Sequence, residues 1–238
     1  MNDKTTAFDE FWELSSLDVF NLQSFAQQMN AYDSEGKELL LSYPEAPRKL
    51  PRPRTRLNTI TKKRRSVRDF SGNKLSEKDL GRIFSSFYAW NGLEHRAYPS
   101  AGANYATEIY GIAFHTKKHE GAIVYYDPEK HGLVQTGRAA PAWDEARTTL
   151  NITVRGEPSL LVIFVLFSER VTSKYGERGG RFALLEVGAA IQQLSLQIAD
   201  SSRLHGVIAG GLLDYYWKNV LGLSGTEARI VIGYLVDV

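Results

Sequence analysis

The chain has 238 residues, of which 43% are hydrophobic and 24% charged, and it contains no cysteine. This composition provides enough apolar side chains for a core, so we expect one folded α/β or α+β unit. The lack of cysteine excludes disulfide frameworks, thiolate metal sites and cysteine nucleophiles. The acidic, polar N-terminus has no signal-peptide pattern, and no apolar stretch approaches the length that crosses a bilayer. We therefore predict a cytoplasmic protein that does not enter a membrane.

The net charge of +2 hides a strongly basic segment, residues 46–68, which contains no acidic residue. It supplies ten of the 29 Lys and Arg side chains, namely Arg48, Lys49, Arg52, Arg54, Arg56, Lys62, Lys63, Arg64, Arg65 and Arg68. A segment of this kind favours an anion or an acidic partner.

The N-terminal part divides into a helical pattern and a proline-rich connector. Aromatic and leucine side chains recur at loosely helical spacing over residues 8–30. Four of the eight prolines lie between Tyr43 and Thr55, where they forbid regular helix and favour an extended, polyproline-like chain. We place the boundary between an N-terminal segment, residues 1–58, and the main domain, residues 59–238.

The first part of the main domain carries one helical pattern and three strand patterns. A capping-box pattern at Ser76 begins a helix predicted over residues 77–90. Residues 107–114 and 122–126 have the composition of strands. The continuous apolar run 159–167 is typical of a strand buried on both faces, so we predict that it is central in the sheet.

The last part of the chain begins with the longest predicted helix, a buried one over residues 181–204 that ends before His205-Gly206. A short strand over 207–211, a short helix over 215–220 and a last strand over 229–236 follow. Together these elements indicate an α+β fold.

A cluster of guanidinium and hydroxyl donors lies at the end of the basic segment. Arg64, Arg65, Ser66 and Arg68 have the groups that hold a phosphate monoester dianion. From composition alone, a solvated basic loop or a nucleic-acid arm explains the same residues equally well. No aromatic side chain is interleaved with them, which weighs against binding of single-stranded nucleic acid.

Two glycine-containing segments are candidates for contact with a flat ligand. The first consists of Pro99, Ser100, Ala101 and Gly102. It combines a proline-fixed turn with small side chains that allow close approach of the backbone. Gly210-Gly211 follows an apolar run and allows the same approach. An ordinary tight turn is the alternative for both segments.

Lys174 and Tyr175 lie in the segment that joins the predicted central strand to the long helix, where a sheet often presents functional side chains. Such a pair can exchange a proton with a substrate, and an ordinary surface pair is the alternative. Of the five histidines only His115 and His119 are close in sequence, and they follow a strand-like run, where the i, i+4 spacing of a helix does not apply. We predict no metal site.

These segments occur in the order, and near the spacing, of one family. From YPEAPRKLPRP through RRSVRDF, YPSAGANYATEIY and KYGERGGRFALLEVG to IAGGLLD, about residues 43–214, the sequence resembles the SagB-type dehydrogenases of the FMN-dependent nitroreductase superfamily. The resemblance implies a nitroreductase-like α+β fold, with a mostly antiparallel sheet flanked by helices, and a homodimer with FMN at the subunit interface. It also implies oxidation of peptide thiazolines or oxazolines to thiazoles or oxazoles. Such enzymes work beside a cyclodehydratase on a ribosomally made precursor peptide.

The resemblance also assigns roles by position. The four donors of the basic cluster correspond to contacts with the FMN phosphate and ribityl chain. The turn 99–102 would lie along the flavin, and Gly210-Gly211 near its reactive edge. Lys174 and Tyr175 match the family's Lys-Tyr motif, which is associated with proton removal from the azoline.

The sequence departs from the family in two places. Ala106 stands where family members usually have proline. The chain ends at Val238, whereas many nitroreductases continue into a tail with further basic phosphate ligands. The proline- and arginine-rich connector is a candidate to replace that contact.

Three other functions are compatible with parts of the sequence. An NAD(P)H-dependent nitro- or quinone reductase of the same superfamily differs in the direction of electron flow, and such enzymes do not typically carry the Lys-Tyr motif or the LPRP connector. A flavin-binding scaffold subunit of a synthetase complex has no redox step, and the intact Lys-Tyr pair weighs against it. Nucleic-acid binding through the basic segment predicts strong, salt-dependent DNA affinity without flavin colour, and we disfavour it.

Overall fold

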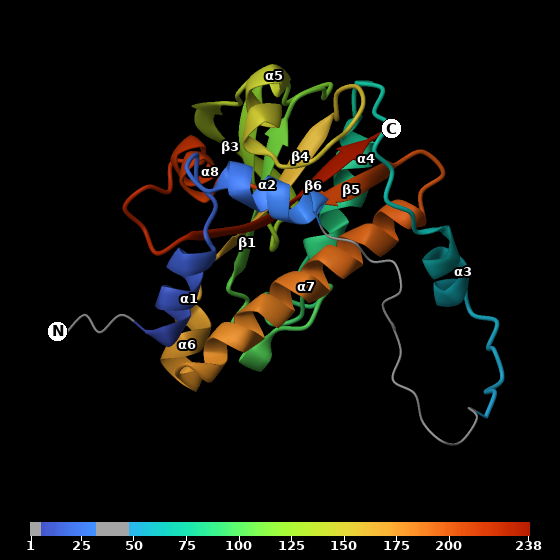
Figure 1. Cartoon of the computed structure of the whole chain (residues 1–238). Helices are drawn as coiled ribbons and strands as arrows, with labels where there is room; N and C mark the ends of the chain where they lie inside the picture. The colour runs from blue at the N-terminus through green and yellow to red at the C-terminus, as the bar shows by residue number, and fades with distance from the viewer. Residues whose placement is uncertain (1–5, 32–47) are drawn as a thin grey trace.

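The computed structural model describes residues 6–31 and 48–238. The helices are α1 (Ala7–Ser15), α2 (Leu22–Asn30), α3 (Arg56–Lys63), α4 (Glu77–Phe84), α5 (Trp143–Ala146), α6 (Glu169–Tyr175), α7 (Arg178–Ala199) and α8 (Asp214–Val220) (Figure 1). The strands are β1 (Thr107–Ala113), β2 (Ala122–Asp127), β3 (Gly132–Ala139), β4 (Leu160–Leu166), β5 (His205–Ala209) and β6 (Arg229–Asp237). Short 3₁₀ turns cover Ser85–Phe87, Ala101–Ala103 and Arg147–Thr149.

The six strands form one sheet in the order β3-β2-β1-β4-β6-β5, and every neighbouring pair is antiparallel. β4 lies between β1 and β6 and is buried along its whole length. Alternate side chains of a strand point to opposite faces, so Phe164 packs into one core and Ile163 into the other. The predicted α+β fold and the central position of the apolar strand are both confirmed.

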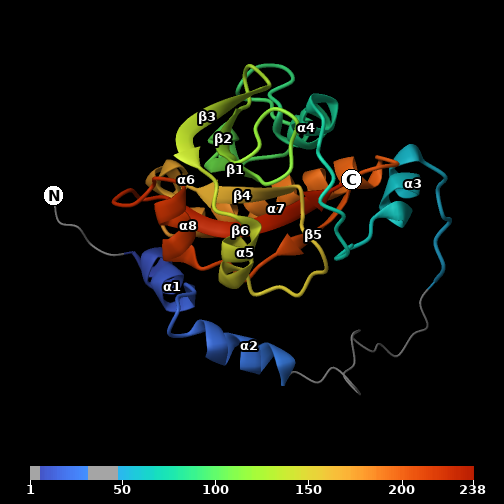
Figure 2. The same ribbon diagram turned by 90° about the horizontal axis from the view of Figure 1, so that it is seen from above.

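Helices cover both faces of the sheet. α4 and α7 pack on one face around Phe84, Val187 and Leu194, whereas α5 and α8 pack on the other through Trp143 and Trp217. Figures 1 and 2 show α7 running beneath the sheet, whereas α5 and α8 lie on the other face of the sheet. Full burial of a large apolar side chain stabilises a fold by roughly 1.5–3 kcal/mol. The sheet therefore forms a rigid platform, with α7 attached along one face.

The predicted helix starts and strands agree closely with the structure. α4 begins with the predicted capping box, in which Ser76 Oγ accepts from Asp79 N–H (3.2 Å) and the Asp79 carboxylate accepts from Ser76 N–H (3.0 Å). This helix ends at Phe84 instead of residue 90, because a 3₁₀ turn and extended Tyr88 follow it. α7 and β5 each begin and end a few residues earlier than predicted.

Two elements are missed by the sequence patterns. β3 is an edge strand with largely exposed side chains, so it lacks the apolar alternation of a strand that faces a core. α3 begins directly after the prolines, where Thr55 Oγ1 caps it by accepting from Asn58 N–H (3.1 Å). The helix crosses the predicted boundary between residues 58 and 59.

The N-terminal segment contains two helices where one helical pattern is predicted. α1 ends because Ser16 has an extended backbone, and α2 starts at Leu22. The proline-rich connector lies partly outside the described residues, and its described part, residues 48–55, contains no helix or strand.

α7 corrects one expectation. By length and composition this helix is long and apolar enough to cross a membrane, although no stretch of that kind is predicted. Its buried side chains, among them Ala183, Val187 and Leu194, face the sheet. That position is typical of the core helix of a folded domain, and it accounts for the apolar composition.

Candidate functional site

Lys174 and Tyr175 are the last two residues of α6, the short helix that follows β4. Gly176 ends this helix with a φ of +57°, a conformation that glycine adopts without steric cost. α7 starts two residues later, and Gly179 lies so close to α6 that a β-carbon on it would be 2.8 Å from Thr172 Cα. The resulting sharp corner presents Lys174 exposed and Tyr175 half-buried.

The turn Pro99–Gly102 lies against these two side chains. Gly102 has a φ of +62°, and a β-carbon on it would lie 2.6 Å from Tyr175 Oη and 2.7 Å from Lys174 Nζ. The Tyr175 ring packs edge-on against Phe182 of α7, with ring centres 5.3 Å apart. The structure thus joins the Lys-Tyr pair and the small-residue turn, which are predicted separately, at one place.

The hydroxyl of Ser100 faces the interior of the protein. It donates to Glu186 Oε2 (2.5 Å) and accepts from Tyr105 N–H (2.9 Å). Glu186 belongs to α7, and its second oxygen accepts from Thr107 N–H at the start of β1 (2.8 Å). Because the Ser100 proton is used within the protein, the turn offers mainly its backbone to a ligand. Pro99 is exposed and Ala101 half-buried.

A second charged side chain holds the same segment from α6. Arg170 Nη1 donates to Glu108 Oε1 (2.5 Å) and to the carbonyl oxygen of Tyr105 (3.1 Å). Glu108 also accepts from Tyr125 Oη (2.8 Å). Tyr105 has a φ of +43° and Ala103 a φ of +57°, conformations that cost about 1–3 kcal/mol each for residues with a β-carbon. The hydrogen bonds around the turn stabilise this strained backbone.

Two tyrosines near the turn are weak acids. Burial raises the pKa of Tyr98 well above its ordinary value, an effect that Arg96 partly offsets. Burial and the Glu108 carboxylate together raise the pKa of Tyr125. Both hydroxyls therefore lose a proton less readily than an ordinary tyrosine.

Sequence reasoning missed Glu186, Arg170 and Glu108. A signal for Glu186 was present, because it is the one charged residue in the stretch 182–191, FALLEVGAAI. A charged residue in such a stretch needs a partner when the helix is buried. Arg170 and Glu108 carry no comparable signal, since their pairing depends on how α6 folds back onto β1.

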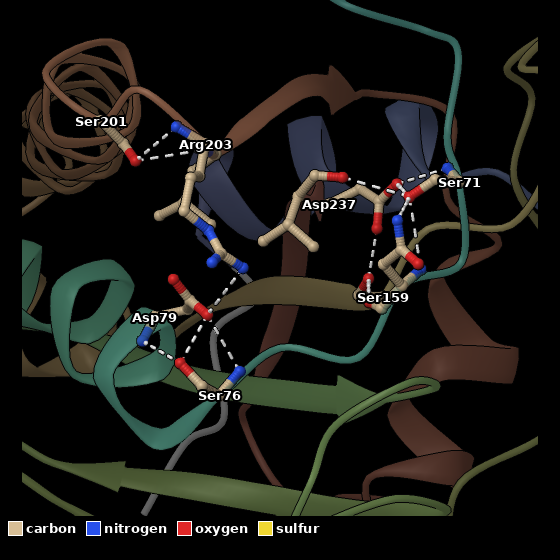
Figure 3. Close-up of polar contacts among 10 residues, drawn as sticks. Ser71, Ser76, Asp79, Ser159, Ser201, Arg203 and Asp237 are labelled. Atoms are coloured by element: carbon tan, nitrogen blue, oxygen red, sulfur yellow. Dashed lines mark hydrogen bonds and ion pairs between the residues drawn. The ribbon is translucent and has the colours of Figure 1, made fainter.

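The basic cluster lies at the other end of the sheet. Val67, within the cluster, donates its N–H to the carbonyl oxygen of Gly206 in the edge strand β5 (3.0 Å). Ser71, just after the cluster, donates through its N–H (2.5 Å) and its hydroxyl (2.9 Å) to the buried carboxylate of Asp237, which also accepts from the Ser159 hydroxyl (Figure 3). These contacts fix the backbone of the cluster to the sheet.

The side chains of the cluster, by contrast, face solvent. Arg65, Ser66 and Arg68 are exposed, and Arg64 is half-buried. Within the described part of the chain none of these three arginines pairs with a carboxylate. Arg65 Nη1 donates to the backbone carbonyl oxygens of Lys62 (2.7 Å) and Arg64 (2.8 Å). The cluster therefore presents cationic donors that an anion can bind.

Within the chain the basic cluster does not lie beside the Lys-Tyr pair. α6 precedes the first residue of α7, whereas α3 lies near its far end (Figure 1), where Arg56 pairs with Asp200 (3.4 Å). A helix of 22 residues is about 33 Å long. The two groups of predicted site residues thus lie at opposite ends of α7.

The two remaining predicted residues, Gly210 and Gly211, follow β5, which β6 separates from β4. The Gly211 carbonyl oxygen accepts from Asn151 N–H (2.7 Å), and a β-carbon on Gly211 would lie 2.6 Å from Asn151 Cβ. Gly210 is exposed, with open space where a β-carbon would point. These glycines follow a strand that lies two places from β4 in the sheet, and the contact with Asn151 explains why position 211 requires glycine.

Comparison with known proteins identifies relatives over most of the chain. Residues 61–236 match the model of the nitroreductase family. The chain is 30% identical over 172 residues to a protein of Methanocaldococcus jannaschii described as a nitroreductase, a match that covers 71% of this chain and 85% of that protein. It is 25% identical over 181 residues to the microcin B17-processing protein McbC of Escherichia coli, covering 70% of this chain and 64% of McbC.

Solved structures share the fold. A chain of the E. coli microcin synthetase McbBCD complex with truncated pro-MccB17 bound matches with a TM-score of 0.70 at 22% identity, over 94% of this chain and 83% of that chain. The NADPH:FMN oxidoreductase of Vibrio harveyi, complexed with NAD+, matches with a TM-score of 0.51 at 16% identity, over 76% of this chain and 67% of that chain. At these identities the structural matches support the fold.

Proposed function

The chain belongs to the nitroreductase family, and on that premise we propose that it is an FMN-dependent dehydrogenase that oxidises azoline rings in a peptide. The substrates are thiazolines or oxazolines of a ribosomally made precursor, and the products are thiazoles or oxazoles. The observation that carries the proposal is the contact of the Gly102 turn with Lys174 and Tyr175. The similarity to McbC, a microcin B17-processing protein, supports the same substrate class.

The residues present fit FMN. Arg65, Ser66 and Arg68 offer exposed donors on a fixed backbone, which suits a phosphate dianion. Because Gly102 has no side chain, Lys174 and Tyr175 reach the backbone of the turn, so a flat ring on the turn would lie beside both. Asn104 lies two residues after the turn, and its Nδ2 atom is buried without a hydrogen-bond partner among the residues that the structure describes. An unpaired buried donor of this kind suits a polar ligand nearby.

We further propose that two copies of the chain complete each site. An exposed stripe on α7 consists of Arg181, Leu185, Gly188 and Gln192, at helical spacing. Leu185 is 69% exposed, so the stripe offers one large apolar side chain to a second copy. A two-fold axis perpendicular to α7 at this stripe would place the basic cluster of one copy beside the Lys-Tyr pair of the other. That arrangement is a homodimer with FMN between its subunits.

The proposed reaction removes a hydride and a proton from the azoline ring. Bound FMN supplies the ring that accepts the hydride. Lys174, in its unprotonated form, accepts the proton from the former α-carbon of the substrate residue, whose C–H is acidified by the neighbouring carbonyl. Tyr175, restrained by Phe182, offers its hydroxyl beside the lysine amine. The backbone of the turn at Gly102 keeps both side chains next to the substrate.

A nitro- or quinone reductase is the second candidate, and the 30% identity to the M. jannaschii nitroreductase favours it. Such an enzyme oxidises NAD(P)H and passes the electrons to an acceptor, so it has no need for a proton acceptor at Lys174. A flavin-binding scaffold subunit is the third candidate. It needs neither Lys174 nor Tyr175, and their contact with Gly102 argues against it.

We propose that the partner is the cyclodehydratase that forms the azolines, in a cytoplasmic synthetase complex. The support is structural similarity to a chain that was solved within a microcin synthetase complex with truncated pro-MccB17 bound. Nucleic-acid binding has weaker support, because the charge of the basic segment accounts only for sequence-independent attraction to phosphates.

The proposed function is tested by the visible spectrum of the purified protein, followed by aerobic incubation with an azoline-containing peptide and mass spectrometry. We expect flavin absorbance and the loss of two hydrogens per ring. Flavin absorbance with NAD(P)H-dependent quinone reduction, and without that mass loss, would support the reductase instead. A colourless protein that FMN does not reconstitute would overturn the flavin dependence.

A further inference from the structure

Glu186 is an acidic side chain in the middle of the apolar helix α7. It is 2% exposed, and Ala183 and Val187 beside it face the core. A polar group is costly to bury unless it is hydrogen-bonded, so packing alone does not account for a carboxyl group here. Both of its oxygens are used, because they accept from Ser100 Oγ (2.5 Å) and from Thr107 N–H (2.8 Å).

We propose that Glu186 is a positioning residue. It holds residues 99–105, which comprise the turn and the strained backbone after it, where the turn meets Lys174 and Tyr175. The inference rests on the proposed azoline oxidation and names a further residue on which that reaction depends. Glu186 does not itself reach the open side of the turn, since both of its oxygens bind within the protein.

The contact passes through Ser100 to the strained part of the turn. A serine hydroxyl has one proton, and here it points to Glu186, which directs a lone pair toward Tyr105 N–H (2.9 Å). Tyr105 has a φ of +43°, a conformation that persists when surrounding contacts determine it. Loss of the carboxyl group would release the turn at Ser100 and the start of β1 at Thr107.

Arg170 holds the same segment from the other helix. It lies one helical turn before Lys174 on α6, so the two side chains share a face of that helix. Arg170 binds the Tyr105 carbonyl oxygen and Glu108, whereas Glu186 binds Ser100 and Thr107. The two helices thus bind alternating residues of one short segment, and this fixes the turn relative to Lys174.

The experiment compares Glu186→Gln with Glu169→Gln, which makes the same change at an exposed position in the first turn of α6. Glutamine keeps an acceptor for Thr107 N–H, but its amide group offers a donor where Ser100 needs an acceptor. Amide hydrogen exchange of residues 101–107, FMN affinity by fluorescence quenching, thermal midpoint, kcat and KM are measured for both variants. Ser100→Ala, which removes the bonds to Glu186 and Tyr105 but keeps the bond between Glu186 and Thr107, is the second variant.

We expect Glu186→Gln to speed amide exchange at Tyr105 by about tenfold and to weaken FMN binding, with exchange in β2 unchanged. Its kcat should fall about tenfold or more, with KM changed less than about threefold, because misplacement of a reacting group lowers turnover at saturating substrate. Ser100→Ala should speed exchange at Tyr105 but leave Thr107 protected. Glu169→Gln should match the wild type throughout.

Amide exchange rates over residues 101–107 that equal those of the wild type in Glu186→Gln would overturn the inference. A loss of stability that speeds exchange equally in every region of the protein would also overturn it. Exchange and FMN affinity do not depend on the identity of the substrate. A wild-type protein that binds FMN but leaves azolines unchanged would therefore refute the proposed reaction, while these two measurements still decide whether Glu186 positions the turn.

Discussion

The two ends of α7 carry the two halves of the proposed site, and they are built in opposite ways. At the Lys-Tyr end the groups touch one another: Gly102 lies against Lys174 and Tyr175, and Glu186 anchors the turn. At the other end the backbone of the basic cluster is fixed, through Val67 and its neighbours, while the arginine side chains face solvent. The end proposed for chemistry is therefore arranged before a ligand arrives, whereas the end proposed for phosphate is completed by its ligand.

The largest effect is expected from a substitution at the Lys-Tyr end. Lys174→Ala removes the proposed proton acceptor and should lower azoline oxidation by about 10²–10⁴-fold, with flavin absorbance retained. Mass spectrometry of the peptide and the visible spectrum measure the two properties. Lys78→Ala, which removes an exposed lysine from α4, is the matched control and should oxidise at the wild-type rate. Full activity in Lys174→Ala would contradict the assignment of Lys174 as the proton acceptor.

A smaller effect is expected where the turn meets the pair. Gly102→Ala places a β-carbon 2.6 Å from Tyr175 Oη, so turnover should fall about 10–100-fold as the side chains move apart. Gly121→Ala is the control, because its φ of +72° imposes a similar backbone strain with open space around the new methyl group. Both variants should lose about 1 kcal/mol of stability, but Gly121→Ala should keep its turnover. Equal turnover in the two variants would show that the contact at Gly102 is irrelevant to the reaction.

At the basic end the expected change is in affinity. Arg65→Ala and Arg68→Ala should each raise the FMN dissociation constant about tenfold, because a charge-assisted hydrogen bond to phosphate is lost. Turnover at saturating FMN should stay within about twofold of the wild type. Fluorescence titration with FMN measures the affinity, and Arg147→Ala, on an exposed turn elsewhere, is the control. Unchanged affinity in both cluster variants would place the phosphate elsewhere.

The smallest effect concerns a group that bonds to neither the Lys-Tyr pair nor the basic cluster. Burial raises the pKa of Asp214 to about 6, with Glu13 contributing, while the N–H of Leu17 opposes the shift by donating to the carboxylate. Because the pKa is raised on folding, this group stabilises the fold fully below about pH 4, and the contribution is lost as pH rises through 6. Since the side chain is only partly buried, we expect a loss of about 1 kcal/mol.

Urea unfolding of the wild type and of Asp214→Asn at pH 4 and pH 7.5 measures this contribution. Relative to Asp214→Asn, the wild type should become less stable by about 1 kcal/mol at the higher pH. FMN affinity and turnover of the variant at pH 7.5 should equal those of the wild type, because Asp214 bonds to Leu17 and to neither group of site residues. A pH-independent difference between the two proteins would contradict the assigned titration.

The sequence predicts the sheet well because its strands carry their own signals. The apolar run of β4 and the capping box at Ser76 each reflect local physics that survives in the fold. β3 escapes prediction because an edge strand has little apolar pattern, and α3 because its cap follows a run of prolines. The predicted ends of α4 and α7 fall several residues too late, because no glycine or proline stands just after either helix.

For the site, the sequence supplies the candidate residues but not their neighbours. The contact between Gly102 and the Lys-Tyr pair joins segments about 70 residues apart, and it depends on how α6 folds back beside β1. Glu186 stands out in an apolar helix, but its partner Ser100 is not identifiable from spacing. Gly211 is a candidate for ligand contact from the sequence, but within the chain it packs against Asn151. The sequence pattern does not distinguish such a packing requirement from a ligand contact.

The most direct test of the central claim is a single turnover without oxygen. Purified protein loaded with FMN is mixed with an azoline peptide, and flavin absorbance is followed together with the peptide mass. We expect that wild-type flavin bleaches while one ring loses two hydrogens for each flavin reduced, and that Lys174→Ala keeps its flavin absorbance. Bleaching of Lys174→Ala at the wild-type rate, or a wild-type flavin that the peptide does not reduce, would contradict the claim.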